Sequence, residues 1–343
     1  MVLDADADAD HNRLVLSLVS AAEERLLDSL VAAVAAAIES IDVGTHAGVH
    51  PRVGAADVVP VVPLGDVRLS ACAELARQLG ERIWSDLGAP VYLYGAASRS
   101  EPRTLAAIRA GRIELDFGRE LHPTAGAVCV GARPPLVAYN IILPGADVAA
   151  ARTLARQVRE SSGGLAGVQA LAFRLSDDAV QLSMNLIDLQ RASPATVYAE
   201  VARLARALQL EPGPDEVVGL CPAVAANVDA ASGNVLEARI AAAAARRFGG
   251  WCVASGDRER SRLGTGLLAE AEKLALVPAR QETFLAAAEE CLAMTRLLAP
   301  TGYTDPEVEA MLSVAARGFE VALLPETRQR HQRRVAYLGK SDA

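Results

Sequence analysis

The residues best suited to chemistry lie in one short loop, residues 44–57, which reads GTHAGVHPRVGAAD. His50 can accept and return a proton near neutral pH, because an imidazole has an ordinary pKa of about 6.5. Arg52 can bind a carboxylate through two parallel hydrogen bonds, and Asp57 can orient either neighbour. The loop therefore allows two interpretations: composition alone slightly favours a polar turn with a purely structural role, and acid–base chemistry on an anionic substrate is the functional interpretation.

A metal site is a third interpretation, because the same loop contains two of the five histidines, His46 and His50. On a helix these two residues would share a face and could bind zinc. Gly44, Gly48 and Pro51 disfavour a helix there. In an extended chain the two rings would lie roughly 13 Å apart, too far for one metal ion. The sequence therefore favours proton transfer and predicts no metal.

Composition restricts the class of protein. A chain of 343 residues with 51% hydrophobic residues can bury a core without disulfides or structural metal. The net charge of −8 argues against nucleic-acid binding. Scattered cysteines without a CxxC pair indicate buried thiols in a reducing compartment. Because no apolar stretch reaches membrane length and the acidic start lacks a basic leader, we expect a cytoplasmic protein without membrane partners.

Apolar periodicity predicts two blocks of strands and helices as far as about residue 222. The first block has expected strands at 12–19, 57–64 and 90–94 and expected helices at 21–41 and 69–87. The second has expected strands at 126–130, 136–143, 168–175, 180–187 and 216–220 and helices at 146–161 and 195–208. Ser70 and Ser193 are the expected helix caps. This order predicts an α+β fold of two split α/β subdomains, with antiparallel-rich sheets and helices on one face.

Beyond residue 225 the pattern is that of an all-helical C-terminal segment. Helices are expected at 235–247, 266–276, 281–298 and 305–324. In the last one Asp305 is the expected cap and Pro306 opens the first turn. Its expected buried face consists of Val308, Met311, Leu312, Ala315 and Phe319. The arginine-rich end of the chain, 328–340, is expected to be a basic surface tail.

The loop at 46–60 resembles the HxGxHPRxGAxDVxPF signature of the glutamate formimidoyltransferase family. Further motifs similar to those of the family follow in the family's order. They are LDADADADHNR at 3–13, PVYLY at 90–94, DFG at 116–118, GAR at 131–133, AYN at 138–140, RESSGGL at 159–165, LSMNL at 182–186 and VGL at 218–220. The resemblance covers about residues 2–222, and an ordered set of motifs is much more specific than one motif.

The resemblance implies two α/β subdomains with a folate-binding groove between their sheets, usually in a homodimer. We expect the N-terminal subdomain at 1–122, the C-terminal subdomain at 123–226 and a helical extension at 227–343. It also implies transfer of a formimino group from N-formimino-L-glutamate to N5 of tetrahydrofolate, the co-substrate, in histidine degradation. The family's catalytic histidine falls on His50, which would take a proton from N5 and return one to the departing glutamate amine.

The remaining expected site residues would bind the two substrates. Both substrates carry carboxylates, which Arg13, Arg52 and Arg133 are expected to meet. Asn140 and Asn185 could read polar pterin or amide edges, or could equally be strand-end residues that bond the backbone. The aspartates of the acidic segment would share one face of an extended strand, and Asp6 is the one expected to hold the cationic amidine. His46 and Asp57 complete the set.

The sequence departs from the family pattern at several places. The family's first strand, with a motif like VPNFSEG, is not matched, so that either the true start lies upstream or a strand is lacking. Pro134 and Pro135 replace the usual Lys-Phe, Val49 stands where glutamate is common, and the stretch 109–116 is shorter. Some relatives carry a formimidoyltetrahydrofolate cyclodeaminase in the place of the helical segment. The PAPGGGS-like segment of that enzyme is absent here, so no deaminase activity is expected. Two alternatives therefore stay open: a non-catalytic folate- or anion-binding member, or transfer of another one-carbon unit such as formyl.

Overall fold

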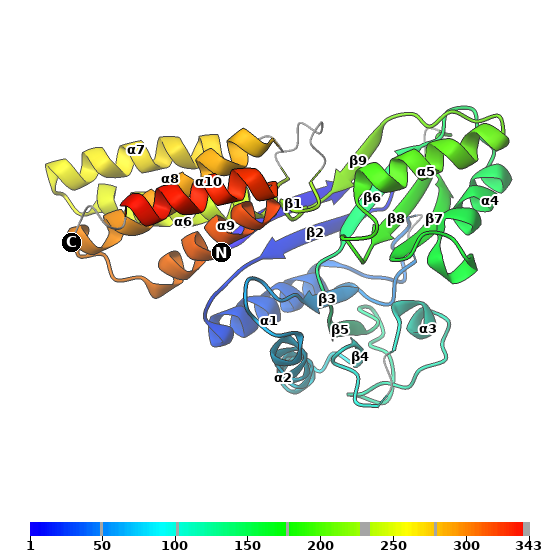
Figure 1. Ribbon diagram of the computed structural model, residues 1–343. Helices are drawn as coiled ribbons and strands as arrows, with labels where there is room; N and C mark the ends of the chain where they lie inside the picture. The colour runs from blue at the N-terminus through cyan, green and yellow to red at the C-terminus, as the bar shows by residue number, and fades with distance from the viewer. Residues whose placement is uncertain (49–50, 101–102, 176–177, 227–233, 278–279, 339–343) are drawn as a thin grey trace. The chain divides into compact units, whose positions relative to one another are not determined.

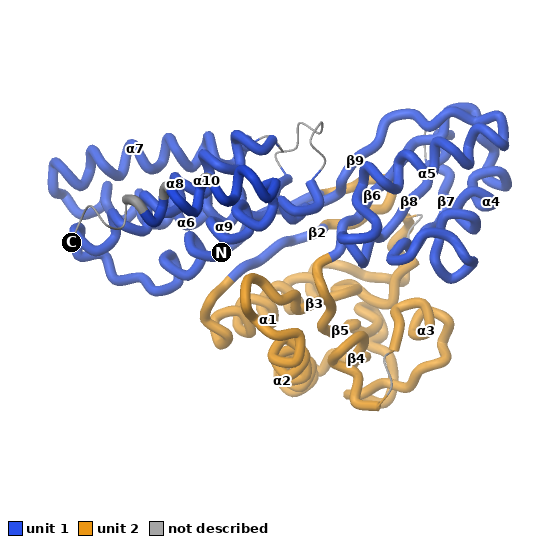
Figure 2. Tube along the Cα trace, viewed as in Figure 1, with its two compact units in different colours: residues 1–6, 15–19, 136–343 blue, residues 7–14, 20–135 orange. Residues whose placement is uncertain are grey.

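A computed structural model describes residues 1–343 apart from 49–50, 101–102, 176–177, 227–233, 278–279 and 339–343 (Figure 1). The chain divides into two compact units (Figure 2). Unit 1 comprises residues 1–6, 15–19 and 136–343, and unit 2 comprises residues 7–14 and 20–135. Each unit has a hydrophobic core of its own, built between a sheet and its helices.

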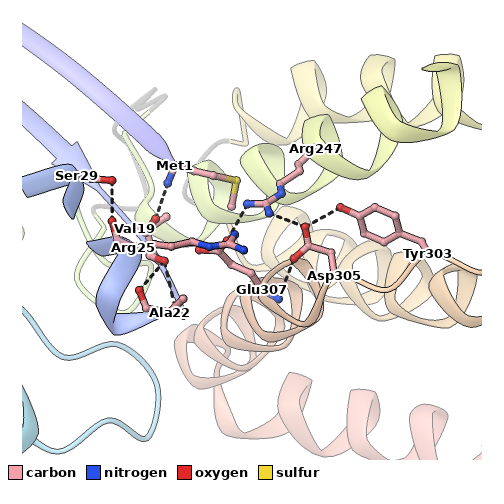
Figure 3. Close-up of polar contacts among 10 residues, drawn as sticks. Met1, Val19, Ala22, Arg25, Ser29, Arg247, Tyr303, Asp305 and Glu307 are labelled. Carbon is pink, nitrogen blue, oxygen red and sulfur yellow. Dashed lines mark hydrogen bonds and ion pairs between the residues drawn. The ribbon is translucent and has the colours of Figure 1, made fainter. Parts of the chain in front are cut away.

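The chain opens with a β-hairpin formed by β1 (Val2–Asp8) and β2 (Arg13–Leu18). The amino group of Met1 donates a hydrogen bond to the carbonyl of Val19 at 2.7 Å, and the backbone N–H of Val19 donates back to Met1 at 2.9 Å (Figure 3). This reciprocal pair closes the open end of the hairpin, and the expected strand at 12–19 is confirmed.

The acidic segment forms β1 and the turn that follows it. Asp4, Asp6 and Asp8 are partly buried and alternate with the exposed Ala5 and Ala7, so these three carboxylates share one face of the strand. The strand ends at Asp8, and Asp10 lies in the turn instead. The expectation that all the aspartates share a strand face therefore holds for three of them, because the chain reverses before the fourth.

Unit 2 contains a three-stranded sheet in the order β3-β5-β4 (Figure 1). Its strands are β3 (Val58–Val61), β4 (Val91–Gly95) and β5 (Val128–Ala132). Both pairs are parallel, which departs from the expected antiparallel-rich pattern. The reason is the connection: the segment between β3 and β4 crosses over through a helix, which brings the next strand back in the same direction. β3, which contains Pro60, lies at an edge of the sheet, where a proline costs no ladder hydrogen bond.

Two helices cover one face of this sheet, and a third lies on the other. The buried residues of α1 (Glu23–Ser40) and α2 (Leu69–Leu87) form one core with alternate strand residues such as Leu93 and Val130. The short α3 (Leu105–Arg109) packs its Ile108 against Tyr94 and Cys129 of the opposite face. Five residues carry too little periodicity for α3 to be predicted from sequence.

Helix α2 begins two positions earlier than its expected cap, Ser70, requires. Arg68 occupies the N-cap position and makes no capping side-chain hydrogen bond among the described residues. Ser70 therefore lies inside the first turn, and its predicted role as cap is wrong. By contrast Ser193 is confirmed as the cap of α5 (Pro194–Ala207), where its side chain accepts a hydrogen bond from the backbone N–H of Thr196.

Unit 1 contains a four-stranded antiparallel sheet in the order β7-β8-β6-β9. The strands are β6 (Val137–Ile142), β7 (Val168–Arg174), β8 (Val180–Leu186) and β9 (Asp215–Val218). The strands expected at 168–175 and 180–187 are confirmed as β7 and β8, which pair antiparallel with each other. Helices α4 (Val148–Val158) and α5 share one core with alternate strand residues, so both cover the same face, as expected. The α+β class is thus confirmed.

The C-terminal part of unit 1 is helical, as expected. It consists of α6 (Leu236–Ala254), α7 (Arg258–Leu274), α8 (Gln281–Thr301), α9 (Pro306–Ala322) and α10 (Pro325–Leu338). The predicted α9 is confirmed in its cap, Asp305, and in its buried face. The segment expected to be a basic surface tail forms most of α10, whose polar sequence shows little helical periodicity. Among the described residues no helix is long and apolar enough to cross a membrane.

Ion pairs and hydrogen bonds join these helices. Arg247 of α6 lies 2.7 Å from both Asp305 and Glu307, and the hydroxyl of Tyr303 donates to Asp305 at 3.0 Å (Figure 3). The start of α9 is therefore tied to the middle of α6. At the other end of α9 the ring of buried His331 lies 2.7 Å from the carboxylate of Glu320, which attaches α10.

Candidate functional site

The second half of the candidate loop is fastened to the start of β5 in unit 2. The backbone N–H of Ala55 donates to Ala125 at 2.9 Å, and that of Ala127 donates to Val53 at 3.2 Å. At Gly54 an added Cβ would lie 2.2 Å from the carbonyl oxygen of Ala127, closer than real Cβ atoms approach. Glycine at this position therefore allows the loop to lie directly on the strand.

The first half of the loop meets the turn at 9–12, also within unit 2. The side-chain amide of Asn12 donates to the carbonyl of Ala47 at 2.8 Å, and Nε2 of His46 lies 2.8 Å from the carbonyl oxygen of Asn12. An added Cβ at Gly48 would lie 2.5 Å from the carbonyl oxygen of His11. The acidic motif and the histidine motif, far apart in sequence, are thus adjacent, a relationship that the sequence analysis did not predict.

These hydrogen bonds assign a proton to His46. The carbonyl oxygen of Asn12 can only accept, so Nε2 of His46 donates to it. Nδ1 of His46 lies 3.4 Å from the side-chain nitrogen of Asn12, and that nitrogen is the donor. Nε2 of His46 therefore carries a proton, and the ring is engaged with the turn. No group of three metal-ligating side chains occurs among the described residues. His50, the predicted catalytic residue, and Val49 lie outside the described residues.

The turn beside the loop contains an ion pair that sequence reasoning missed. Nδ1 of the buried His11 lies 2.7 Å from Oδ2 of Asp8, and the backbone N–H of His11 donates to Oδ1 at 2.9 Å. Partial burial alone would raise the pKa of Asp8, but the hydrogen bonds and charge of His11 outweigh it and leave that pKa below its usual value. The motif DADHN contained the signal, because it places a carboxylate three residues before a histidine.

Asp57 uses both of its carboxylate oxygens within unit 2. Oδ1 accepts a hydrogen bond from the backbone N–H of Val53 at 2.5 Å, and Oδ2 forms an ion pair with Nη2 of Arg109 at 2.7 Å. The described partners of Asp57 are therefore its own loop and α3. Arg109 was not among the predicted site residues, since nothing local in the sequence connects it to a residue 52 positions away.

The predicted arginines occupy different settings in unit 2. Arg52 donates from Nη2 to the carbonyl of Gly48, four positions earlier, at 3.1 Å. Arg133 follows β5, donates to the carbonyl of Pro134 at 3.0 Å and lies beside Tyr94. Burial lowers the pKa of Arg133, and the Tyr94 hydroxyl opposes that shift. Arg13 is partly buried at the start of β2.

The other predicted binding residues lie in unit 1. Asn140 on β6 is buried and donates to the carboxylate of Glu216 at 3.0 Å, rather than to a backbone group. Asn185 on β8 is exposed and pairs opposite Ala138. Both asparagines point away from the face covered by α4 and α5, because strand residues alternate between faces. Asp6 is partly buried on β1.

Comparison with known proteins shows the family. The family model described as "Formiminotransferase domain, N-terminal subdomain" matches residues 1–133, and the model "Formiminotransferase domain" matches residues 138–237. The chain belongs to the formiminotransferase family. The resemblance that the sequence analysis drew from its motifs is therefore confirmed, and the helices after α6 lie beyond both matches.

Individual members of the formiminotransferase family are similar to most of the matched region. Glutamate formimidoyltransferase of Thermoplasma acidophilum is 38% identical over 269 residues, which cover 71% of this chain and 88% of the relative. The protein of the same name from Streptococcus pyogenes serotype M1 is 37% identical over 239 residues, which cover 65% of this chain and 80% of the relative. Formimidoyltransferase-cyclodeaminase of Gallus gallus is 39% identical, but this chain covers only 44% of its length.

Proposed function

We propose that this chain is a glutamate formimidoyltransferase, which moves a formimino group from N-formimino-L-glutamate to N5 of its co-substrate tetrahydrofolate. One observation carries the proposal: the two formiminotransferase models match residues 1–133 and 138–237, and relatives named for this activity are matched over 88% and 80% of their own lengths. A match of that extent includes the candidate loop and both larger sheets.

The reaction needs a group that moves a proton in both directions. N5 of tetrahydrofolate attacks the amidine carbon and must lose a proton, and the departing glutamate amine must gain one. We assign both transfers to His50. This assignment rests on the sequence HPR and on the way its described neighbours are held, because Arg52 and Gly54 hold the loop through the contacts given above.

We propose that the carboxylates of the two substrates are bound by Arg13, Arg52 and Arg133, since guanidinium groups form charge-assisted hydrogen bonds with carboxylates. Asn140 and Asn185 are proposed to form hydrogen bonds with the polar edges of the pterin or of the amide. Asp6 is proposed to bind the cationic amidine. His46 and Asp57 are proposed to belong to the same site. Bringing both substrates into one site replaces a collision by a positioned reaction, which lowers the entropic part of the barrier.

The wider setting is also proposed. We place the subdomain boundaries at 1–122, 123–226 and 227–343, and we propose a cytoplasmic homodimer that acts in histidine degradation. All five cysteines are buried free thiols, which agrees with a reducing compartment. The acidic net charge of −8 agrees with small-molecule substrates rather than nucleic acid.

The deciding experiment offers the purified full chain tetrahydrofolate together with N-formimino-L-glutamate or, separately, N-formyl-L-glutamate. Mass spectrometry then measures the group gained by tetrahydrofolate and the glutamate released. We expect formimino transfer with equal release of glutamate. Transfer from the formyl donor alone would identify another one-carbon unit, and tetrahydrofolate binding without transfer from either donor would identify a non-catalytic member.

A further inference from the structure

The ion pair between Arg109 and Asp57 connects α3 to the segment 51–57, which we call the anchor segment. Asp57 ends this segment, and its carboxylate accepts the N–H of Val53 four residues earlier. A charge-assisted bond to its second oxygen further restricts the orientation of a carboxylate that closes a turn in this way. Arg109 holds that oxygen at 2.7 Å.

We propose that Arg109 is a positioning residue, which keeps the anchor segment in the geometry required for transfer by holding Asp57, without touching either substrate. The inference rests on the proposed function, because it adds to the same site a residue from a different element. Whether Arg109 holds the anchor segment can also be tested without any measurement of transfer.

The charge of Asp57 requires this partner, because the carboxylate lies in a poorly solvated place. The side chains of Asp57 and Arg109 are only 23% and 20% exposed. Both lie close to Cys129: burial raises the pKa of that thiol to about 12, the Asp57 carboxylate adds to the shift, and Arg109 opposes it. Without Arg109 a partly buried negative charge would be uncompensated, and the carboxylate would turn towards solvent and release Val53.

Arg109 is itself held rigidly. It is the last residue of α3, whose first turn is capped by the side chain of Thr104 accepting from the backbone N–H of Ala107 at 3.2 Å. The preceding Ile108 is buried and fixes the helix on the sheet. A guanidinium mounted on a packed helix loses little further freedom when it forms the ion pair.

The anchor segment transmits this constraint to the neighbouring motif. Arg52, which lies inside the segment, reaches back to the carbonyl of Gly48 at 3.1 Å. The carbonyl of Asp57 accepts from the backbone N–H of Cys129 at 3.0 Å, which ties the other end to β5. A displacement of about 1 Å in such a segment can cost about 100-fold in rate.

Unit 2 contains a matched control pair, Arg103 and Asp116. Oδ2 of Asp116 forms an ion pair with Arg103 at 2.6 Å and also accepts the backbone N–H of Leu93 at 2.8 Å. The side chain of Asp116 is 4% exposed and so is more deeply buried than that of Asp57. Asp116 bonds to β4, however, and not to the anchor segment. Removing Arg103 therefore removes an equivalent ion pair outside the proposed site.

The first test measures kcat and the KM of both substrates for the full chain and for Arg109→Met, Arg109→Lys and Arg103→Met. We expect Arg109→Met to lower kcat roughly 10-fold to 100-fold while each KM changes less than about 3-fold, and Arg109→Lys to restore most of the rate. Arg103→Met should lower the melting temperature without changing kcat. Unchanged kcat in Arg109→Met, or a large rise in KM alone, would overturn the proposal.

The double variant Arg109→Met/Asp57→Asn separates positioning through Asp57 from an independent effect. We expect it to be no slower than the slower single variant, because both changes break the same connection. If the fold losses of kcat in the two single variants multiplied in the double variant, Arg109 would act by a route other than Asp57, which would contradict the proposal.

The second test uses hydrogen exchange of the same proteins and needs no turnover. Arg109→Met should accelerate exchange in the anchor segment, above all at the amide of Val53, whereas Arg103→Met should accelerate it at Leu93 instead. Unaltered exchange at Val53 in Arg109→Met overturns the positioning role. Absence of transfer by the unaltered chain, together with the expected exchange pattern, would instead reject the proposed function, while the finding that Arg109 holds the anchor segment through Asp57 would stand.

Discussion

Glu237 in the first turn of α6 accepts a hydrogen bond from the backbone N–H of Ala223, which lies 2.7 Å from its Oε2. The side chain is 8% exposed, and an added Cβ at Gly318 of α9 would lie 2.4 Å from its Cγ. Burial raises the pKa of Glu237 to about 7, and the Ala223 hydrogen bond only partly opposes this. The family match at 138–237 ends at this residue, within the first turn of α6.

The raised pKa of Glu237 predicts a loss of stability as pH rises. The folded chain binds this proton more tightly than the unfolded chain, whose carboxyl has the ordinary pKa of 4.5. The contribution is therefore complete below about pH 4.5, decreases through about pH 7 and is lost above it. Glu237→Gln should raise the free energy of unfolding at pH 8 by roughly 2–3 kcal/mol and change it little at pH 4.5.

Urea unfolding at the two pH values measures this difference. The exposed Glu309 of α9 supplies the control, since Glu309→Gln should change the unfolding free energy by less than about 0.5 kcal/mol at either pH. The same dependence on pH in Glu237→Gln as in the unaltered chain would show that another group titrates.

Gly54→Ala should destabilise unit 2 and slow transfer, because the new methyl group would lie 2.2 Å from the carbonyl oxygen of Ala127. Either the loop or the start of β5 must move, at a cost of about 1–3 kcal/mol typical of overpacking. The control is Gly250→Ala on an exposed part of α6, where the added Cβ meets no described atom within 4 Å. That change should stabilise the helix by about 0.5–1 kcal/mol. A Gly54→Ala variant with unchanged melting temperature and kcat would contradict the close approach.

Arg247→Met should lower the free energy of unfolding by about 2 kcal/mol, because it leaves the Glu307 carboxylate, 8% exposed, without this cation (Figure 3). The neighbouring Arg246 forms an exposed pair with Glu272 at 3.3 Å, so Arg246→Met should cost less than about 0.5 kcal/mol. Adding Glu307→Gln to Arg247→Met should recover part of the loss. Urea unfolding compares the variants, and equal losses for the two arginines would refute the importance of burial.

His50→Ala should lower kcat by about 10²-fold to 10⁴-fold while far-ultraviolet circular dichroism and the melting temperature stay unchanged, because a general acid–base group contributes to rate rather than to packing. Added imidazole should restore part of the rate by supplying the missing base. Normal turnover in His50→Ala would assign proton transfer to a different group.

Several features could be predicted because they depend on neighbouring residues. The buried face of α9 and its cap at Asp305 follow from helical spacing and from a side chain next to the first turn. The hairpin of β7 and β8 follows from two apolar runs separated by a short polar turn. The motif around Arg52 and Asp57 identified the candidate loop for the same reason, as a short uninterrupted sequence.

Other features depend on contacts between distant segments, which no local pattern specifies. The parallel pairing of β3 with β5, the contact of Asn12 with His46 and the ion pair of Arg109 with Asp57 join residues that are tens of positions apart. Which partner a strand or a charge meets is decided by how the chain folds back, since many pairings satisfy the same local preferences. The amino-acid sequence thus determined most of the elements, the family and the candidate loop, whereas the tertiary structure decided what holds that loop and which carboxylates are buried.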